Sequence, residues 1–213
     1  YVDYTGTIWA NQMKREDNLP REAMYEEIVR WESENTGMRV LGKLGFENAY
    51  GLAVTRETAS AKGLNSIADL ARIAPQMTVG GDPEFFERPE WIAVRDTYGL
   101  RFGEKRTFSP TFMYNALRSG EADVIGAYTS DGRIEADKLA VLTDPEGAFP
   151  NYDAVLVLSP DAAQNKALVS SLQPLVGAID VSAMRAANYS VDRETNKLSF
   201  DEAARLLAER AGL

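Results

Sequence analysis

The stretch Phe46-Glu47-Asn48-Ala49-Tyr50-Gly51-Leu52-Ala53-Val54 leads from a polar turn directly into a short apolar strand. We predict strands over residues 40–44 and 52–55 around a turn over 45–48, because short apolar runs bounded by Gly and Asn are typical of strands. The chain contains no repeat, low-complexity tract or long linker, so a single flexible domain boundary is not expected. We expect the chain to cross between two lobes twice, through the second of these strands and through another at 154–158.

Candidate helices and short apolar strands alternate along the rest of the chain, which favours a layered α/β fold with largely parallel strand pairing. A helix is predicted over residues 20–34. Helices are also predicted to start at Asp82-Pro83 and at Ser109-Pro110, because a capping side chain there precedes a proline at the first helical position. The capping box Ser199-Phe200-Asp201-Glu202 predicts a final helix that ends at Gly212.

The composition excludes several classes of function. Hydrophobic residues make up 45% of the chain and charged residues 26%, which is ordinary for a globular protein. The net charge of −9 argues against a nucleic-acid partner, because phosphate binding requires a basic surface. Cysteine and histidine are both absent, which excludes thiolate nucleophiles and removes the commonest general base and most zinc ligands. Catalysis by carboxylates or lysine is still possible, but we predict no catalytic residue, no metal and no cofactor.

Four tyrosines stand at the heads or tails of predicted strands, in polar loops rather than on apolar helix faces. They are Tyr4, Tyr50, Tyr128 and Tyr152. Aromatic rings gathered at strand ends can form a cage for a quaternary ammonium ion, which offers no hydrogen-bond donor and is bound by ring faces. Arg88 follows a predicted strand and Gly-Gly turn, and its guanidinium could hold a carboxylate at the other end of the same ligand.

Each of these residues also has a structural interpretation. A single tyrosine is more often part of a core than of a binding site, and Arg88 could form a surface ion pair with Glu84 or Glu87. The segment that follows Tyr128 resembles a calcium-binding loop only superficially, because it lacks the alternating acidic ligands. Asp131 in that segment is interpreted instead as a residue that orients the loop carrying Tyr128.

A family resemblance favours the ligand-binding interpretation. The chain resembles the substrate-binding proteins of ABC importers for glycine betaine, choline and related osmoprotectants, and the resemblance extends over its whole length, including the ending Gly212-Leu213. Five segments carry it, in this order: Tyr4-Thr5-Gly6-Thr7, Phe46-Glu47-Asn48-Ala49-Tyr50-Gly51-Leu52-Ala53-Val54, Phe85-Phe86-Glu87-Arg88, Tyr128-Thr129-Ser130-Asp131-Gly132-Arg133-Ile134 and Phe149-Pro150-Asn151-Tyr152.

The resemblance implies a two-lobed class II periplasmic-binding-protein clamshell, with lobe I over residues 1–50 and 153–213 and lobe II over 51–152. It also implies a set of ligand-binding residues in which four tyrosines surround the ammonium group, a threonine and an arginine hold the carboxylate, and an asparagine lies beside the cage through its backbone. These residues are Tyr4, Thr7, Asn48, Tyr50, Arg88, Tyr128 and Tyr152.

The chain departs from the family pattern at its start. Family members begin with further strand–helix units and a ligand-contacting loop, for which nothing matches here, so we expect the N-terminal part of lobe I, on the order of 50–60 residues, to be missing. The chain opens on Tyr1 without an export signal. The proline that often follows the last tyrosine of the cage is also absent after Tyr152, and we expect this to be minor.

The resemblance implies a solute receptor rather than an enzyme. The implied partners are a quaternary ammonium ligand (glycine betaine, proline betaine, choline or carnitine) and an ABC permease in the membrane, and the implied location is periplasmic or anchored at the cell surface. Two alternatives remain open at this point. One is a sensor domain of the same fold, and the other is an enzyme that acts on methylated amines through paired acids such as Asp131 and Asp153.

Overall fold

The computed structural model describes residues 1–17 and 19–212, so Leu213 of the family ending lies outside the described residues. The chain forms two compact units. Unit 1 comprises Tyr1–Ala49 and Pro150–Leu213, and unit 2 comprises Tyr50–Phe149. The boundaries expected from the sequence, after residues 50 and 152, lie one residue and three residues later than those of the structure. They differ because Tyr50 starts a strand of unit 2, whereas the Tyr152 carbonyl accepts a hydrogen bond from the Asn48 backbone of unit 1 at 3.0 Å.

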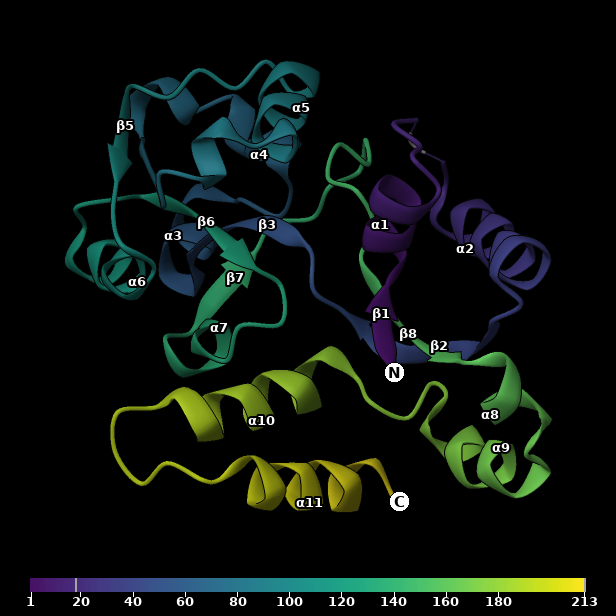
Figure 1. The fold of residues 1–213 in the computed structure, drawn as a ribbon. Helices are drawn as coiled ribbons and strands as arrows, with labels where there is room; N and C mark the ends of the chain where they lie inside the picture. The colour runs from purple at the N-terminus through teal and green to yellow at the C-terminus, as the bar shows by residue number, and fades with distance from the viewer. Residues whose placement is uncertain (18, 213) are drawn as a thin grey trace. The chain divides into compact units, whose positions relative to one another are not determined.

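Unit 1 is built on a three-stranded sheet with the order β1-β8-β2 (Figure 1). The strands are β1 (Val2–Tyr4), β8 (Asp153–Leu158) and β2 (Arg39–Glu47), and both pairings are antiparallel. The predicted turn over 45–48 is wrong, because β2 continues through Glu47. Gly45, with φ of 117°, adopts a backbone conformation that favours glycine, and the register shift that follows lets Glu47 pair with Asp153.

Helical segments lie between β1 and β2 and after β8 in the sequence. Ile8, Met24 and Ile28 are fully or almost fully buried with Val155 and Val157 of β8. A capping box at Ser199 starts the last long helix and Gly212 ends it, as predicted. The helical elements of unit 1 are α1 (Thr5–Thr7), η1 (Ile8–Gln12), α2 (Arg21–Trp31), η2 (Glu32–Thr36), α8 (Pro160–Gln164), α9 (Lys166–Leu172), η5 (Gln173–Leu175), α10 (Val181–Asp192) and α11 (Phe200–Ala211).

Unit 2 contains a five-stranded sheet with the order β5-β4-β6-β3-β7 (Figure 1). Its strands are β3 (Tyr50–Thr55), β4 (Thr78–Gly81), β5 (Glu104–Thr107), β6 (Val124–Tyr128) and β7 (Leu139–Val141). Only the pairs β4–β5 and β4–β6 are parallel, whereas β3 pairs antiparallel with β6 and with β7. The expectation of largely parallel pairing is therefore wrong. Helical connections return the chain in the same direction from β4 through β5 and β6 to β7, but β3 runs opposite to all of them and lies between β6 and β7.

The helices of unit 2 confirm the predicted start at Ser109-Pro110 and correct the one at Asp82-Pro83. α6 starts at Pro110 and ends at Gly120, and a capping box at Ser66 starts α4. The Asp82-Pro83 segment starts only a short 3-10 turn, because Pro89 restricts the preceding residue to an extended conformation and the longer helix begins there. The helical elements of unit 2 are α3 (Arg56–Lys62), α4 (Ile67–Ala71), η3 (Ala74–Gln76), η4 (Phe85–Glu87), α5 (Pro89–Thr97), α6 (Pro110–Ser119) and α7 (Arg133–Ala136).

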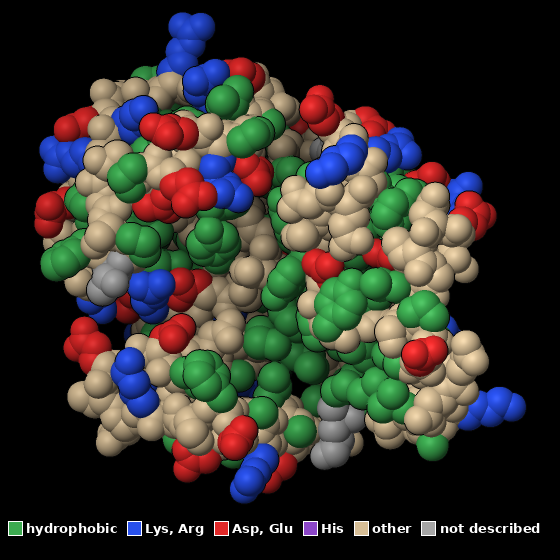
Figure 2. All heavy atoms as spheres, in the orientation of Figure 1, with side chains coloured by type: hydrophobic (Ala, Val, Ile, Leu, Met, Phe, Trp, Pro, Cys, Tyr) green, Lys and Arg blue, Asp and Glu red, His purple; other side chains and the backbone are tan. Residues whose placement is uncertain are grey.

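Charged side chains of both signs are interspersed on the face of the molecule drawn in Figure 2. On that face basic side chains do not gather into a continuous field, which agrees with the net charge of −9. Within residues 1–17 and 19–212, every helix is too short or too polar to cross a lipid bilayer.

Candidate ligand-binding site

Two of the predicted cage tyrosines lie side by side in unit 2. Tyr50 is the first residue of β3 and Tyr128 is the last residue of β6, and the antiparallel register places them directly opposite each other. Their ring centroids are 4.6 Å apart with the planes tilted by 32°, and their hydroxyls are hydrogen-bonded at 2.7 Å. The two tyrosines therefore form one aromatic corner at the end of the sheet.

The two rings of this corner differ in exposure. Tyr50 is 8% exposed, whereas Tyr128 is 44% exposed. Behind Tyr50 lies Phe85, which is fully buried with its ring centroid 5.3 Å from that of Tyr50. Burial raises the pKa of the Tyr50 phenol, and the hydrogen bond with Tyr128 raises it further. Tyr50 is thus a neutral phenol held in place by the core, and Tyr128 offers its ring to solvent.

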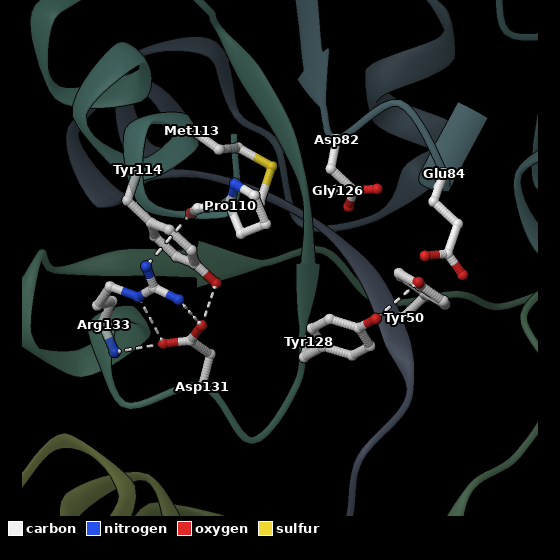
Figure 3. Close-up of a pocket in the computed structure, with 10 residues that line it drawn as sticks. All are labelled: Tyr50, Asp82, Glu84, Pro110, Met113, Tyr114, Gly126, Tyr128, Asp131 and Arg133. Carbon is white, nitrogen blue, oxygen red and sulfur yellow. Dashed lines mark hydrogen bonds and ion pairs between the residues drawn. The ribbon is translucent and has the colours of Figure 1, made fainter. Parts of the chain in front are cut away.

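A cavity of about 180 Å³ opens beside this corner (Figure 3). Gly126 contributes backbone to its wall, and a Cβ atom there would lie 2.5 Å from the Phe85 ring. The sequence had a signal for this approach, because a glycine inside a strand marks a place where another group comes close. The residues that line the cavity and that the sequence did not assign to a site are Asp82, Glu84, Pro110, Met113, Tyr114, Gly126 and Arg133.

Arg88 lies between η4 and α5 and not, as expected, directly after a turn, because Gly80 and Gly81 belong to β4. Its Nη1 atom donates to the Glu84 carboxylate, and its Nε atom lies 3.5 Å from an oxygen of Glu90. Its Cζ atom lies 5.2 Å from the centroid of the Tyr50 ring. The ion pair with Glu84 that the sequence offered as an alternative is therefore present, and it stands next to the aromatic corner.

The other four predicted site residues belong to unit 1. Tyr4 ends β1 opposite Ala154, and Thr7 ends α1 and is half-buried. The Asn48 backbone N–H donates to the Tyr152 carbonyl at 3.0 Å. The Tyr152 ring lies against Gly6, where a Cβ atom would be 2.7 Å from the ring carbons. Glycine is thus required between Tyr4 and Thr7 for the backbone to approach Tyr152.

Thr5 was not predicted to contribute to this group, although it fixes the chain around Tyr152. Its hydroxyl donates to the Asn151 carbonyl at 3.1 Å and accepts from the Asp153 N–H at 3.0 Å. Thr5 is 1% exposed. The contacts of Tyr152 and its neighbours thus come from three segments of unit 1 that are far apart in sequence.

The loop after Tyr128 is fixed by Asp131. The Asp131 backbone N–H donates to the Tyr128 carbonyl at 3.0 Å, and its carboxylate accepts from the Tyr114 hydroxyl at 2.8 Å and from the Arg133 guanidinium at 2.6 Å (Figure 3). Burial acts to raise the pKa of Asp131, but the hydrogen bonds from Arg133 and Tyr114 outweigh it and hold this pKa below its usual range. These contacts are those of a residue that orients the loop.

We expect replacement of Asp131 by asparagine to reduce stability more at pH 7 than in acid. Because the pKa of Asp131 is lower in the folded chain, its stabilising effect is complete above about pH 4 and is lost as the pH falls through the folded value. The loss at pH 7 should be about 1–2 kcal/mol, the size of a charge-assisted hydrogen bond in a partly exposed site. Urea denaturation at pH 7 and pH 3 measures it.

Asp161→Asn is the matched control, since Asp161 is an exposed carboxylate in α8. The same difference between wild type and Asp131→Asn at both pH values would contradict the assignment of an ionised Asp131 paired with Arg133.

The chain passes twice between two α/β units, and Tyr50 and Tyr152 lie beside these crossings. This is the architecture of the periplasmic-binding-protein class of ligand receptors. A model of the family described as substrate binding domain of ABC-type glycine betaine transport system matches residues 1–207. The chain belongs to this family, as the resemblance indicated.

Individual relatives agree with this assignment. The chain is 29% identical over 215 residues to the ergothioneine transport permease/ergothioneine binding protein EgtU of Helicobacter pylori, and the match covers 100% of this chain and 38% of that protein. It is 30% identical over 205 residues to a glycine-betaine-binding protein of Pseudomonas aeruginosa, covering 90% and 66%. The chain thus spans 38% and 66% of the length of these two curated relatives.

A solved structure described as a glycine betaine/carnitine/choline ABC transporter superposes with a TM-score of 0.91 at 27% identity, covering 99% of this chain and 78% of that one. The periplasmic-binding-protein fold expected from the resemblance is therefore confirmed.

Proposed function

We infer that this chain is the receptor part of an ABC importer and binds a quaternary ammonium solute. The observation that carries this inference is the hydrogen-bonded pair of Tyr50 and Tyr128 at the edge of a cavity in unit 2. The solutes that fit are glycine betaine, proline betaine, choline and carnitine. Ergothioneine joins them because a relative is named for it, and it is also a trimethylammonium compound.

The chemistry of the cage follows from the charge of the ligand. A trimethylammonium group presents methyls with diffuse positive charge, so ring faces bind it while carboxylates cannot accept a hydrogen bond from it. Each tyrosine face within about 6 Å contributes roughly 0.5–2 kcal/mol. Four rings would supply much of the roughly 8 kcal/mol that corresponds to a micromolar dissociation constant.

Residues of both units contribute to the site in this proposal. Tyr4 and Tyr152 would complete the cage, with Asn48 beside it through its backbone, and Thr7 and Arg88 would hold the carboxylate of a zwitterionic ligand. The support is the family membership together with the clustering of each set within its own unit. A ligand that contacts the site residues of unit 1 and those of unit 2 would favour the conformation in which both units engage it, because those contacts exist only there.

The family is one of transport binding domains, and we propose that this chain likewise delivers its solute to a membrane permease and turns over no substrate. Its location would be periplasmic or at the cell surface, where a receptor meets solute outside the membrane.

Calorimetric titration of the full-length protein tests the proposal. Glycine betaine, proline betaine, choline, carnitine or ergothioneine should bind with a dissociation constant near the micromolar range, and ammonium and lysine should not. The absence of binding heat for all five solutes would reject the proposed function.

Replacement of Tyr128 by alanine should weaken binding of the preferred solute by about 2- to 30-fold, which corresponds to the loss of one ring face. Tyr189→Ala is the matched control, because Tyr189 lies in α10 and is 39% exposed, close to the exposure of Tyr128. An unchanged dissociation constant for Tyr128→Ala would remove this residue from the site.

A further inference from the structure

The guanidinium of Arg88 already has partners in the chain itself. Glu84 accepts a hydrogen bond from its Nη1 atom, and an oxygen of Glu90 lies 3.5 Å from its Nε atom. The same guanidinium lies over the Tyr50 ring, with its Cζ atom 5.2 Å from the ring centroid. Two carboxylates of the protein therefore face the cation that is expected to receive the carboxylate of a ligand.

The two glutamates differ strongly in exposure. The Glu84 side chain is 73% exposed, whereas that of Glu90, in the first turn of α5, is 10% exposed. An ion pair in solvent is weak, because water and salt screen it, and a buried pair is costly to break because a charge is left without compensation. Glu84 is thus the partner that Arg88 can exchange, and Glu90 is the partner that it keeps.

Glu84 also lines the cavity beside the aromatic corner. It follows Asp82 and Pro83 after the end of β4, and Figure 3 shows its carboxylate turned toward Tyr50. A ligand whose ammonium group rests on Tyr50 and Tyr128 and whose carboxylate reaches Arg88 would meet Glu84 at that guanidinium. One exposed carboxylate therefore stands where a second carboxylate would have to bind.

We propose that Glu84 competes with the ligand for Arg88 and thereby sets the selectivity between zwitterionic and purely cationic quaternary amines. The inference rests on the proposed function, because it assumes an ammonium ligand at Tyr50 and Tyr128. A betaine must displace Glu84 to reach Arg88, and its own carboxylate is repelled by the displaced one. Choline carries no carboxylate, so it leaves the Arg88–Glu84 pair intact and is attracted by the charge of Glu84.

The test compares two ligands on the Glu84→Gln variant of the full-length protein. We expect the affinity for glycine betaine to rise by about 1.4- to fivefold, the size of an exposed ion pair, and the affinity for choline to stay level or fall. The ratio of the two dissociation constants, measured by calorimetry at low ionic strength, is the readout. The effect should shrink at high salt, since the pair is screened.

Glu87→Gln is the matched control. Glu87 is exposed and lies three residues from Glu84, and its replacement by glutamine changes the net charge by the same amount. A second control repeats Glu84→Gln in the Arg88→Ala background, where competition for the guanidinium cannot occur and the ratio should move less. A general effect of negative charge would instead shift the ratio equally in both backgrounds.

The outcomes separate this inference from the proposed function. If the unsubstituted protein binds neither ligand, the proposed function fails and the inference fails with it. If it binds them and Glu84→Gln leaves the ratio unchanged, or if Glu87→Gln shifts the ratio equally, only the inference is overturned.

Discussion

Replacement of Phe85 by alanine is expected to lower the free energy of unfolding by about 3–5 kcal/mol, the range found for truncation of a buried aromatic ring. Phe85 is fully buried, and its ring centroid lies 5.3 Å from that of Tyr50 and 5.4 Å from those of Phe86 and Trp91. Gly126 approaches the same ring so closely that no side chain fits between them. Truncation therefore removes the centre of an aromatic stack, and urea denaturation measures the loss.

Phe112→Ala is the matched control for this truncation, because Phe112 is 66% exposed on α6 and its loss should change stability by less than about 0.5 kcal/mol. The Phe85 variant should also bind ligand more weakly at temperatures where it stays folded, since Tyr50 loses the ring behind it. Equal stability of the two variants would contradict the buried position of Phe85, and unchanged ligand binding would show that the stack does not support Tyr50.

Local signals in the sequence were sufficient for many helix ends. Ser66 and Ser199 form their capping boxes within four residues, and Gly120 ends α6 in the left-handed conformation, so each depends only on its sequence neighbours. The turn expected over 45–48 failed for the opposite reason. Residues 45–47 belong to β2 because Glu47 still pairs with Asp153 of β8, which is more than 100 residues away.

The candidate site likewise has features that could be predicted from the sequence and features that depend on contacts between distant segments. That Tyr50 and Tyr128 stand at strand ends could be read from the sequence, but their juxtaposition depends on the register between β3 and β6. The partner of Arg88 was among the alternatives, because Glu84 is four residues away. Asp82 and Tyr114 had no signal as cavity residues, since they meet only when β4, β6 and α6 come together.

Replacement of Arg88 by alanine should weaken the binding of glycine betaine by about 10- to 150-fold, the range that corresponds to one hydrogen bond to a charged group. Choline has no carboxylate, so its dissociation constant should change by less than about threefold. Arg95→Ala is the matched control, because Arg95 lies on α5 and pairs with Asp96. Calorimetric titration of both ligands against the full-length variants measures the difference.

The exchange with Glu84 places the expected loss toward the lower end of this range. In the free protein Arg88 is already paired with Glu84, so binding replaces one carboxylate by another and the net gain is smaller than a new ion pair would give. Equal losses for betaine and choline in Arg88→Ala would mean that Arg88 acts through its position over the Tyr50 ring. A loss for betaine alone would place the ligand carboxylate at the guanidinium, because only that contact distinguishes the two solutes.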